Sequence, residues 1–231
     1  MSQFTSYQEE EKYVIITLKN GKANAISAEV IDELNKHLDK AEADKKVVIL
    51  TGTEGMFSAG YDLKTMTKSP KDATQLVTQG STLALRMLSF PMPIIVASTG
   101  HSLAKGAFLL LCADYRIGTE GAFKIGLNEV AIGMTMHNAG ITIAKARLAP
   151  VFFERSVNNA EIYTPSDAIT AGFLDKITTT EAILPTATKV ALMFSQIDLK
   201  AHAKTKLKLR KPYLDALEKA IELDKTQLFN K

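Results

Sequence analysis

Two uninterrupted apolar runs of strand length do most to restrict the fold of this chain of 231 residues. They read KVVILTGT at residues 46–53 and PIIVASTG at residues 93–100. A strand that does not alternate between apolar and polar residues is typical of a sheet covered by helices on both faces, and such sheets are mostly parallel. A third run, YVIITLKN at residues 13–20, is β-branched and is followed by a glycine, which predicts a strand that ends in a turn.

Stretches with helical periodicity lie between these runs and after them. Residues 27–44 begin with Ser27, which is suited to cap a helix, and place apolar residues at helical spacing. Strands that alternate with helices indicate an α/β fold with mostly parallel strands. We expect an α/β core over residues 1–195 and a more charged helical region over residues 196–231, which packs on the outside or on another subunit. Two short strands are predicted within residues 114–126, and further helices at 72–89, 103–113, 138–149, 181–197 and 200–228.

The composition excludes several classes of protein. A net charge of +3 does not favour nucleic-acid binding, which depends on contacts between basic residues and phosphates. The single cysteine, Cys112, can form no disulfide within the chain, is expected in the core, and does not indicate an oxidising compartment. No run of about 18 apolar residues predicts a membrane span, and the opening MSQFTSYQEEEK has no targeting pattern. We therefore expect a cytoplasmic protein without a nucleic-acid or membrane partner.

Two stretches with small residues directly follow the two buried runs. The first, GMFSAGYDL at residues 55–63, contains Ser-Ala-Gly, which lets backbone come close to a ligand. The second, STGHSLAKGAFLLLCAD at residues 98–114, leads into a predicted helix that begins near Lys105 with free backbone N–H groups. Ligands of open α/β sheets bind beyond the carboxyl ends of strands, so the two loops could aim two N–H groups at one oxygen, as an oxyanion hole does. The alternatives are an ordinary strand-to-helix turn and a core helix with a tight start.

The stretch FKIGLNEVAIGM at residues 123–134 places one carboxylate, Glu129, among apolar residues. A carboxylate removed from water is costly, so Glu129 has to be paired, to reach the surface, or to have a raised proton affinity. Beside two N–H donors, such a group could move a proton at a carbon next to a carbonyl. A glutamate that starts a helix or forms a salt bridge is the alternative.

Four motifs in order resemble the crotonase (enoyl-CoA hydratase/isomerase) family: FSAGYDL, GHSLAKGAFLLLCADYRI, IGLNEVAIG and PSDAITAGFLDKI. VIITLKNGKANAIS resembles the first strand and turn of that family, and the similarity covers about residues 10–180. The resemblance implies an α/β fold made of a crotonase-like spiral of ββα units, followed by a C-terminal helical trimerisation region. It also implies an acyl-CoA thioester as substrate and assembly as a homotrimer or a dimer of trimers.

The resemblance further implies a set of site residues. The thioester oxygen would lie between the backbone N–H groups of Tyr61 and Lys105, and Glu129 would be the catalytic base. No metal is expected, and no cofactor other than the coenzyme A that is part of the substrate. Coenzyme A would lie along two loops, mainly through backbone contacts, at Lys22, Ala23, Ala25, Ser58, Ala59, Gly60, Tyr61, Asp62, Leu63, Ala104 and Lys105.

One position favours an isomerase over a hydratase. Hydratases of the family carry a second glutamate six residues before the Asp of the CAD-like segment, and that position here is Phe108. Hydration of a double bond needs two groups to activate water, whereas moving a double bond from position 3 to position 2 needs one base. The stretch CADYRI…IGLNE also resembles the mitochondrial isomerase branch, which keeps the glutamate at position 129. A hydratase, a lyase, a thioesterase, a decarboxylase and a non-catalytic acyl-CoA binder are the alternatives.

Several other residues have open roles. Lys105 replaces a glycine of the family, and its side chain could point to solvent, to a phosphate or to the thioester. His137 is more often structural than catalytic in such a place. Asp62 and Lys64 are expected to be a solvated loop pair, and KTKLKLRK at residues 204–211 a solvated face or a source of cations for the coenzyme A phosphate. The methionines are expected to fill the core, with an acyl pocket as the alternative: Met56, Met66, Met87, Met134 and Met136.

Overall fold

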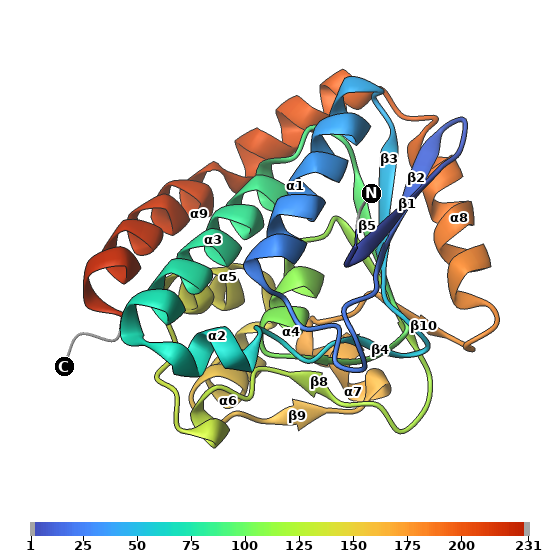
Figure 1. Cartoon of the computed structure of the whole chain (residues 1–231). Coiled ribbons are helices and arrows are strands. Elements are labelled where there is room, and N and C mark those ends of the chain that lie inside the picture. Colours follow the sequence, from blue (N-terminus) through green and yellow to red (C-terminus); the bar gives the residue numbers. More distant parts are fainter. Residues whose placement is uncertain (1–2, 229–231) are drawn as a thin grey trace.

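The computed structural model describes residues 3–228 as two sheets packed against helices (Figure 1). Residues 1–2 and 229–231, at the ends of the predicted core and helical region, lie outside the described residues. The six-stranded sheet has the order β1 (Thr5–Glu9), β2 (Tyr13–Leu18), β3 (Val47–Thr51), β5 (Ile94–Ser98), β7 (Tyr115–Thr119) and β10 (Lys176–Thr178). The four-stranded sheet has the order β4 (Gly55–Ser58), β6 (Gly100–Leu103), β8 (Ile125–Gly126) and β9 (Ile162–Tyr163).

Helices connect and cover these strands. They are α1 (Ala28–Ala43), α2 (Leu63–Lys68), α3 (Pro70–Ser89), α4 (Lys105–Leu111), a 3₁₀ helix (Val130–Ile132), α5 (Asn138–Arg147), α6 (Pro150–Val157), α7 (Pro165–Ala171), α8 (Ile183–Phe194) and α9 (Leu199–Gln227). Within residues 3–228, no helix combines the length and the apolar character that crossing a membrane requires.

The chain repeats a ββα order that confirms the predicted spiral. β3, β5 and β7 lie side by side and parallel in the six-stranded sheet. Each is followed by a strand of the other sheet, β4, β6 or β8, and these three are also parallel neighbours. Helices α3, α4 and α5 complete the three units. The strands are mostly parallel, as predicted; the exceptions among the described pairs are β1 with β2 and β8 with β9, which run antiparallel.

The two apolar runs are buried on both faces, as their pattern predicts. Val48 and Leu50 of β3 belong to the main core beneath α1 and α3. Val47 and Ile49 point the other way, into a second apolar cluster closed by α8. Figure 1 shows the sheet between α8 on one side and α1 and α3 on the other. The lack of alternating polar residues in these strands therefore has a direct structural cause.

Several predicted boundaries were wrong for local reasons. The helix predicted at 103–113 begins only at Lys105, because residues 100–103 form β6. The helix predicted from residue 72 begins at Pro70, because the Ser69 hydroxyl caps it by accepting from the Asp72 N–H at 3.0 Å. Helix α8 is shorter than the predicted 181–197. The sequence patterns did not predict helices α2, α6 and α7.

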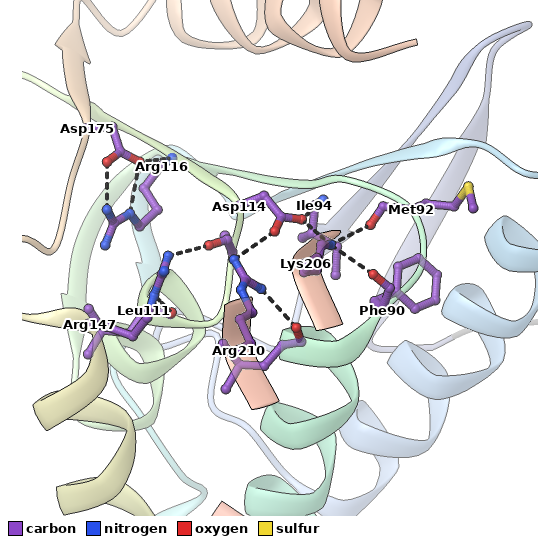
Figure 2. Close-up of polar contacts among 12 residues, drawn as sticks. Phe90, Met92, Ile94, Leu111, Asp114, Arg116, Arg147, Asp175, Lys206 and Arg210 are labelled. Atoms are coloured by element: carbon purple, nitrogen blue, oxygen red, sulfur yellow. Dashed lines mark hydrogen bonds and ion pairs between the residues drawn. The ribbon is translucent and has the colours of Figure 1, made fainter. Parts of the chain in front are cut away.

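Two residues of the stretch KTKLKLRK are buried, whereas its other six residues are exposed, as predicted. Lys206 and Arg210 are one helical turn apart and both point to Asp114, which directly precedes β7 (Figure 2). The Lys206 Nζ lies 2.6 Å from Asp114 Oδ2, and Arg210 Nη2 lies 2.8 Å from Asp114 Oδ1. The side chains of all three are less than 8% exposed. We call these three residues the Asp114 cluster.

Backbone groups complete the hydrogen bonding of the Asp114 cluster. The Lys206 ammonium also donates to the carbonyl oxygens of Phe90, at 2.8 Å, and Met92, at 3.1 Å. Arg210 donates to the carbonyl oxygen of Leu88, at 2.9 Å, and the Ile94 N–H donates to Asp114 at 2.8 Å. Buried charges are tolerated when paired and hydrogen-bonded in this way. The cluster therefore fastens α9 to the end of α3 and the start of β5.

A second carboxylate fastens the far end of α9. Asp224 is 1% exposed and accepts hydrogen bonds from the backbone N–H groups of Asn138, at 2.8 Å, and Ala139, at 2.9 Å. These are the first two residues of α5, so Asp224 satisfies donors that a helix leaves free at its start. Apolar residues between the two attachments, including Leu217 and Ile221, belong to the main core. Helix α9 is thus held along most of its length.

Candidate active site

A cavity of about 420 Å³ opens where the loops after β2, β4 and β6 meet the segment after β8. Most of the predicted site residues line it: Ala23, Ala25, Ala59, Gly60, Tyr61, Asp62, Leu63, Ala104 and Glu129. Five further residues line the cavity that were not among the predicted site residues: Lys64, Met66, Asn128, Ile132 and Met134. Met66 and Met134 were expected in the core, whereas Met87 and Met136 are core residues as predicted.

The two backbone N–H groups predicted to bind the thioester oxygen have no hydrogen-bond partner among residues 3–228. One belongs to Tyr61, whose neighbours are both used: Ile26 N–H donates to Gly60 O at 2.8 Å, and Asp62 N–H donates to Ile26 O at 3.0 Å. In such a parallel bridge the intervening N–H of Tyr61 points away from Ile26. The other belongs to Lys105, the first residue of α4, where a helix leaves its N–H groups free.

The two unused N–H groups are brought together by a close approach of backbones at Gly60. A Cβ atom placed on Gly60 would lie 2.8 Å from the Cβ of Ala104 and 3.4 Å from the backbone nitrogen of Lys105. Gly60 has φ +108°, a conformation that residues with side chains rarely adopt. Ala104 has φ 49° and ψ −122°, a strained backbone of the kind that is found at functional sites. The loops can therefore offer two N–H groups to one oxygen.

Of the three alternatives that the sequence left open for Glu129, the structure favours a buried carboxylate with a raised proton affinity. It is 8% exposed, and its Oε2 atom is buried without a hydrogen-bond partner. Burial raises the pKa of Glu129 from 4.5 to about 7, and the Lys105 cation opposes this rise. Among the described residues Glu129 forms no salt bridge, but it directly precedes the 3₁₀ helix Val130–Ile132, in agreement with the helix-start alternative, and its side chain makes no capping hydrogen bond there. A carboxylate that titrates near neutral pH can both take and return a proton.

The Lys105 side chain does not reach solvent. It is 2% exposed, and its Nζ donates to the carbonyl oxygen of Gly80 in α3 at 2.6 Å. The Nζ also lies 5.7 Å from the centre of the Tyr61 ring, within the range of a cation–π contact. Burial lowers the pKa of Lys105 to about 8. Gly80 is essential to this arrangement, because a Cβ there would lie 2.1 Å from the Tyr61 hydroxyl.

Phe108 and His137 pack together behind the cavity. Phe108 is 1% exposed, and its ring lies 5.5 Å from that of His137 in an edge-to-face arrangement. Burial lowers the pKa of His137 to about 4, so the imidazole is neutral at neutral pH. Neither residue lines the cavity. This placement fits the structural role that was favoured for His137.

Ser58 and Lys22 lie outside the cavity lining, and Asp62 lines the cavity but has another role than predicted. Ser58 is fully buried, and its hydroxyl donates to the carbonyl oxygen of Asn24 at 2.8 Å, so it supports the loop from beneath. Lys22 is exposed and lies outside the cavity lining. Asp62 is not part of a solvated loop pair, because its carboxylate caps α2 by accepting from the N–H of Thr65 at 2.9 Å and from its hydroxyl at 2.7 Å. Lys64 is the second residue of that helix.

The chain matches the family model for enoyl-CoA hydratase/isomerase over residues 8–231. It belongs to the enoyl-CoA hydratase/isomerase family. A crystal structure of a family member from Pseudomonas syringae is 55% identical, covers 99% of both chains and superposes with a TM-score of 0.98.

Two curated relatives carry different activities in their names. A probable enoyl-CoA hydratase of Bacillus subtilis is 38% identical over 130 residues, which are 54% of this chain and 50% of that protein, so the match spans only half of the relative's length. The mitochondrial enoyl-CoA delta isomerase 1 of mouse is 29% identical over 228 residues, which are 91% of this chain and 74% of that protein. The family and its enzymatic character are thus established, while the reaction has to be argued from the site.

Proposed function

We propose that the protein is an enoyl-CoA isomerase that moves a double bond from position 3 to position 2 of an unsaturated acyl-CoA. The proposal rests on how the two carboxylates that line the cavity are hydrogen-bonded. Of the two that line it within residues 3–228, Asp62 is used to cap α2, and only Glu129 has a buried oxygen without a partner. Phe108 occupies the position at which a hydratase of the family would have its second glutamate.

The proposed reaction needs one base and one oxyanion site. Glu129 removes a proton from C2, and the electron pair of the broken C–H bond moves onto the thioester oxygen. The backbone N–H groups of Tyr61 and Lys105 donate to this enolate oxygen, a contact that strengthens as charge develops. Protonated Glu129 then returns the proton at C4, and the double bond forms between C2 and C3. No proton, electron or other reactant is needed from outside.

The cavity also supports a binding mode for the thioester. Small side chains at Ala23, Ala25 and Ala59 leave backbone accessible along one wall, which we assign to coenzyme A. Met66, Ile132 and Met134 form an apolar part of the lining, which we assign to the acyl chain. We propose no cofactor beyond the substrate's own coenzyme A.

We also propose assembly as a homotrimer or a dimer of trimers through the C-terminal helices. Large apolar side chains are exposed on α8 and α9 and in the connection between them: Leu184, Leu192, Met193, Ile197, Leu207, Leu209 and Leu223. Apolar side chains that gather on one face are typical of a surface that another subunit covers.

Ultraviolet absorbance of the conjugated enoyl thioester tests the proposed reaction. With a 3-enoyl-CoA, the protein is expected to generate this absorbance, and with the matching 2-enoyl-CoA the absorbance should persist. Loss of the 2-enoyl band would instead indicate a hydratase, the activity in the name of the Bacillus subtilis relative. Binding of both thioesters without any spectral change would indicate a non-catalytic acyl-CoA binder.

A further inference from the structure

The Lys105 ammonium is a buried positive charge without a paired carboxylate. Its described contacts are the Gly80 carbonyl oxygen and the ring of Tyr61, and within residues 3–228 it forms no salt bridge. A carbonyl dipole and a ring face compensate such a charge only in part. The other deeply buried lysine, Lys206, is fully paired with Asp114. Lys105 therefore retains an electrostatic attraction for negative charge nearby.

Negative charge near Lys105 comes from the reacting groups. Each of Lys105 and Glu129 affects the pKa of the other in the direction expected for opposite charges. The backbone N–H of Lys105 is one of the two donors proposed for the thioester oxygen. One residue thus combines a buried cation with a donor proposed for the thioester oxygen, and its Nζ contacts the ring of Tyr61, whose N–H is the other proposed donor.

The other titratable groups around Lys105 do not replace this charge. Burial raises the pKa of the Tyr61 hydroxyl and that of the Cys112 thiol on α4, so both are neutral at neutral pH. His137, before α5, is neutral because burial lowers its pKa to about 4. Asp224 on α9 accepts hydrogen bonds from the start of α5. Lys105 is therefore the cation whose charge acts on Glu129.

We propose that the Lys105 side chain is a positioning residue that holds Tyr61 against α3 and stabilises negative charge on Glu129 and on the enolate. When the C2 proton moves to Glu129, the negative charge passes from the carboxylate to the thioester oxygen, and the cation speeds this step to the extent that it stabilises the enolate more than the carboxylate. The inference rests on the proposed function. It adds a role for a side chain at a position where a glycine would supply only its N–H.

The variant Lys105→Gln tests the side chain while it keeps the backbone N–H and a donor for Gly80. The probe is acetoacetyl-CoA, whose enolate absorbs in the near ultraviolet, so the pH at which half of the bound probe is enolised can be measured without turnover. Because the cation favours the anionic forms, its removal should raise this pH by about one unit. The acidic limb of the kcat/KM profile should move in the same direction. Lys105→Arg, which keeps the charge, should restore both towards the wild-type values.

Lys206→Gln is the matched control, since it removes the other buried ammonium. It should lower the stability of the fold and leave the enolisation pH unchanged. An unchanged enolisation pH in Lys105→Gln would overturn the inference and would leave the proposed isomerase activity intact. A wild-type protein that enolises acetoacetyl-CoA but does not isomerise 3-enoyl-CoA would disprove the activity alone. If Lys105→Gln does not fold, the same titration of Lys105→Met decides by the same criterion.

Discussion

The Asp114 cluster and the cavity at Glu129 are two buried ionic regions with opposite kinds of hydrogen bonding. In the first, Asp114, Lys206 and Arg210 pair with one another and with backbone groups. In the second, within residues 3–228, the Glu129 Oε2 atom lacks a partner, and Lys105 has only a carbonyl oxygen and a ring. A buried charge whose hydrogen-bond and ion-pair partners are present fixes how helices and strands pack together. A buried charge that lacks such partners stays available for reaction. The hydrogen-bond partners of a buried charged residue, more than its residue type, thus distinguish a structural role from a catalytic one.

The largest expected effect is on turnover at the unsatisfied region. Glu129→Gln removes the base and keeps the shape of the side chain, so kcat should fall by about 10²- to 10⁴-fold. Binding of the thioester, measured by calorimetry, should be retained, because the N–H groups of Tyr61 and Lys105 belong to the backbone. Undiminished turnover in this variant would remove Glu129 from the mechanism.

The same variant should differ from the wild type in how stability depends on pH. Glu129 has a folded-state pKa of about 7 against an ordinary value of 4.5, so the folded protein binds the extra proton more tightly. This contribution to stability is complete below pH 4.5 and is lost as the pH rises through 7. In denaturant unfolding, the free energy of unfolding of Glu129→Gln should therefore rise relative to that of the wild type as the pH increases from 4.5 through 7, by as much as roughly 3 kcal/mol. Parallel pH profiles for the two proteins would contradict the buried, unpaired carboxylate.

At the satisfied region the effect should be on stability alone. Asp114→Asn leaves Lys206 and Arg210 buried without their counter-charge, so the free energy of unfolding should fall by about 3–5 kcal/mol. The kcat of the molecules that remain folded should match the wild type. Asp215→Asn is the control, because its exposed ion pair with Lys211 contributes at most about 0.5 kcal/mol. Equal losses of unfolding free energy in the two variants would mean that burial does not make the Asp114 cluster more stabilising than an exposed ion pair.

A smaller effect is expected at Asp224, the satisfied carboxylate that caps α5. Asp224→Ala leaves the N–H groups of Asn138 and Ala139 without their acceptor and should lower the free energy of unfolding by about 1–2 kcal/mol. The comparison variant is Asp198→Ala, which removes the cap of α9 at an exposed position and should cost less. A larger loss at Asp198 than at Asp224 would contradict this order.

The parts of the fold that were predicted depend on local pattern. β3 and β5 were predicted because burial on both faces removes polar residues from a short segment, and that property can be read from the sequence. The stretch containing Lys206 was predicted as solvated because its partner, Asp114, is 92 residues away in the sequence. No periodicity within a helix reveals such a pairing. The Ser69 cap of α3 shows that short-range signals also decide boundaries to within a few residues.

The sequence predicted which backbone segments meet at the candidate site better than it predicted where the side chains point. The Ser-Ala-Gly segment and the start of α4 were predicted to meet, since both follow neighbouring strands of one sheet. The direction of the Lys105 side chain could not be predicted, because its acceptor, the Gly80 carbonyl oxygen, lies 25 residues away in α3. Met66 and Met134 were expected to fill the core, and residue type alone does not distinguish a cavity wall from a packed interior.

Gly80 has a consequence for how related sequences can diverge. With tyrosine at position 61, even a methyl group at position 80 would overlap the phenol oxygen, and the ring that the Lys105 ammonium contacts would have to move. Positions 61, 80 and 105 are therefore expected to covary as a set among homologues. A homologue in which one of these three residues is substituted is expected to carry substitutions at the other two as well, although the three positions are far apart along the chain.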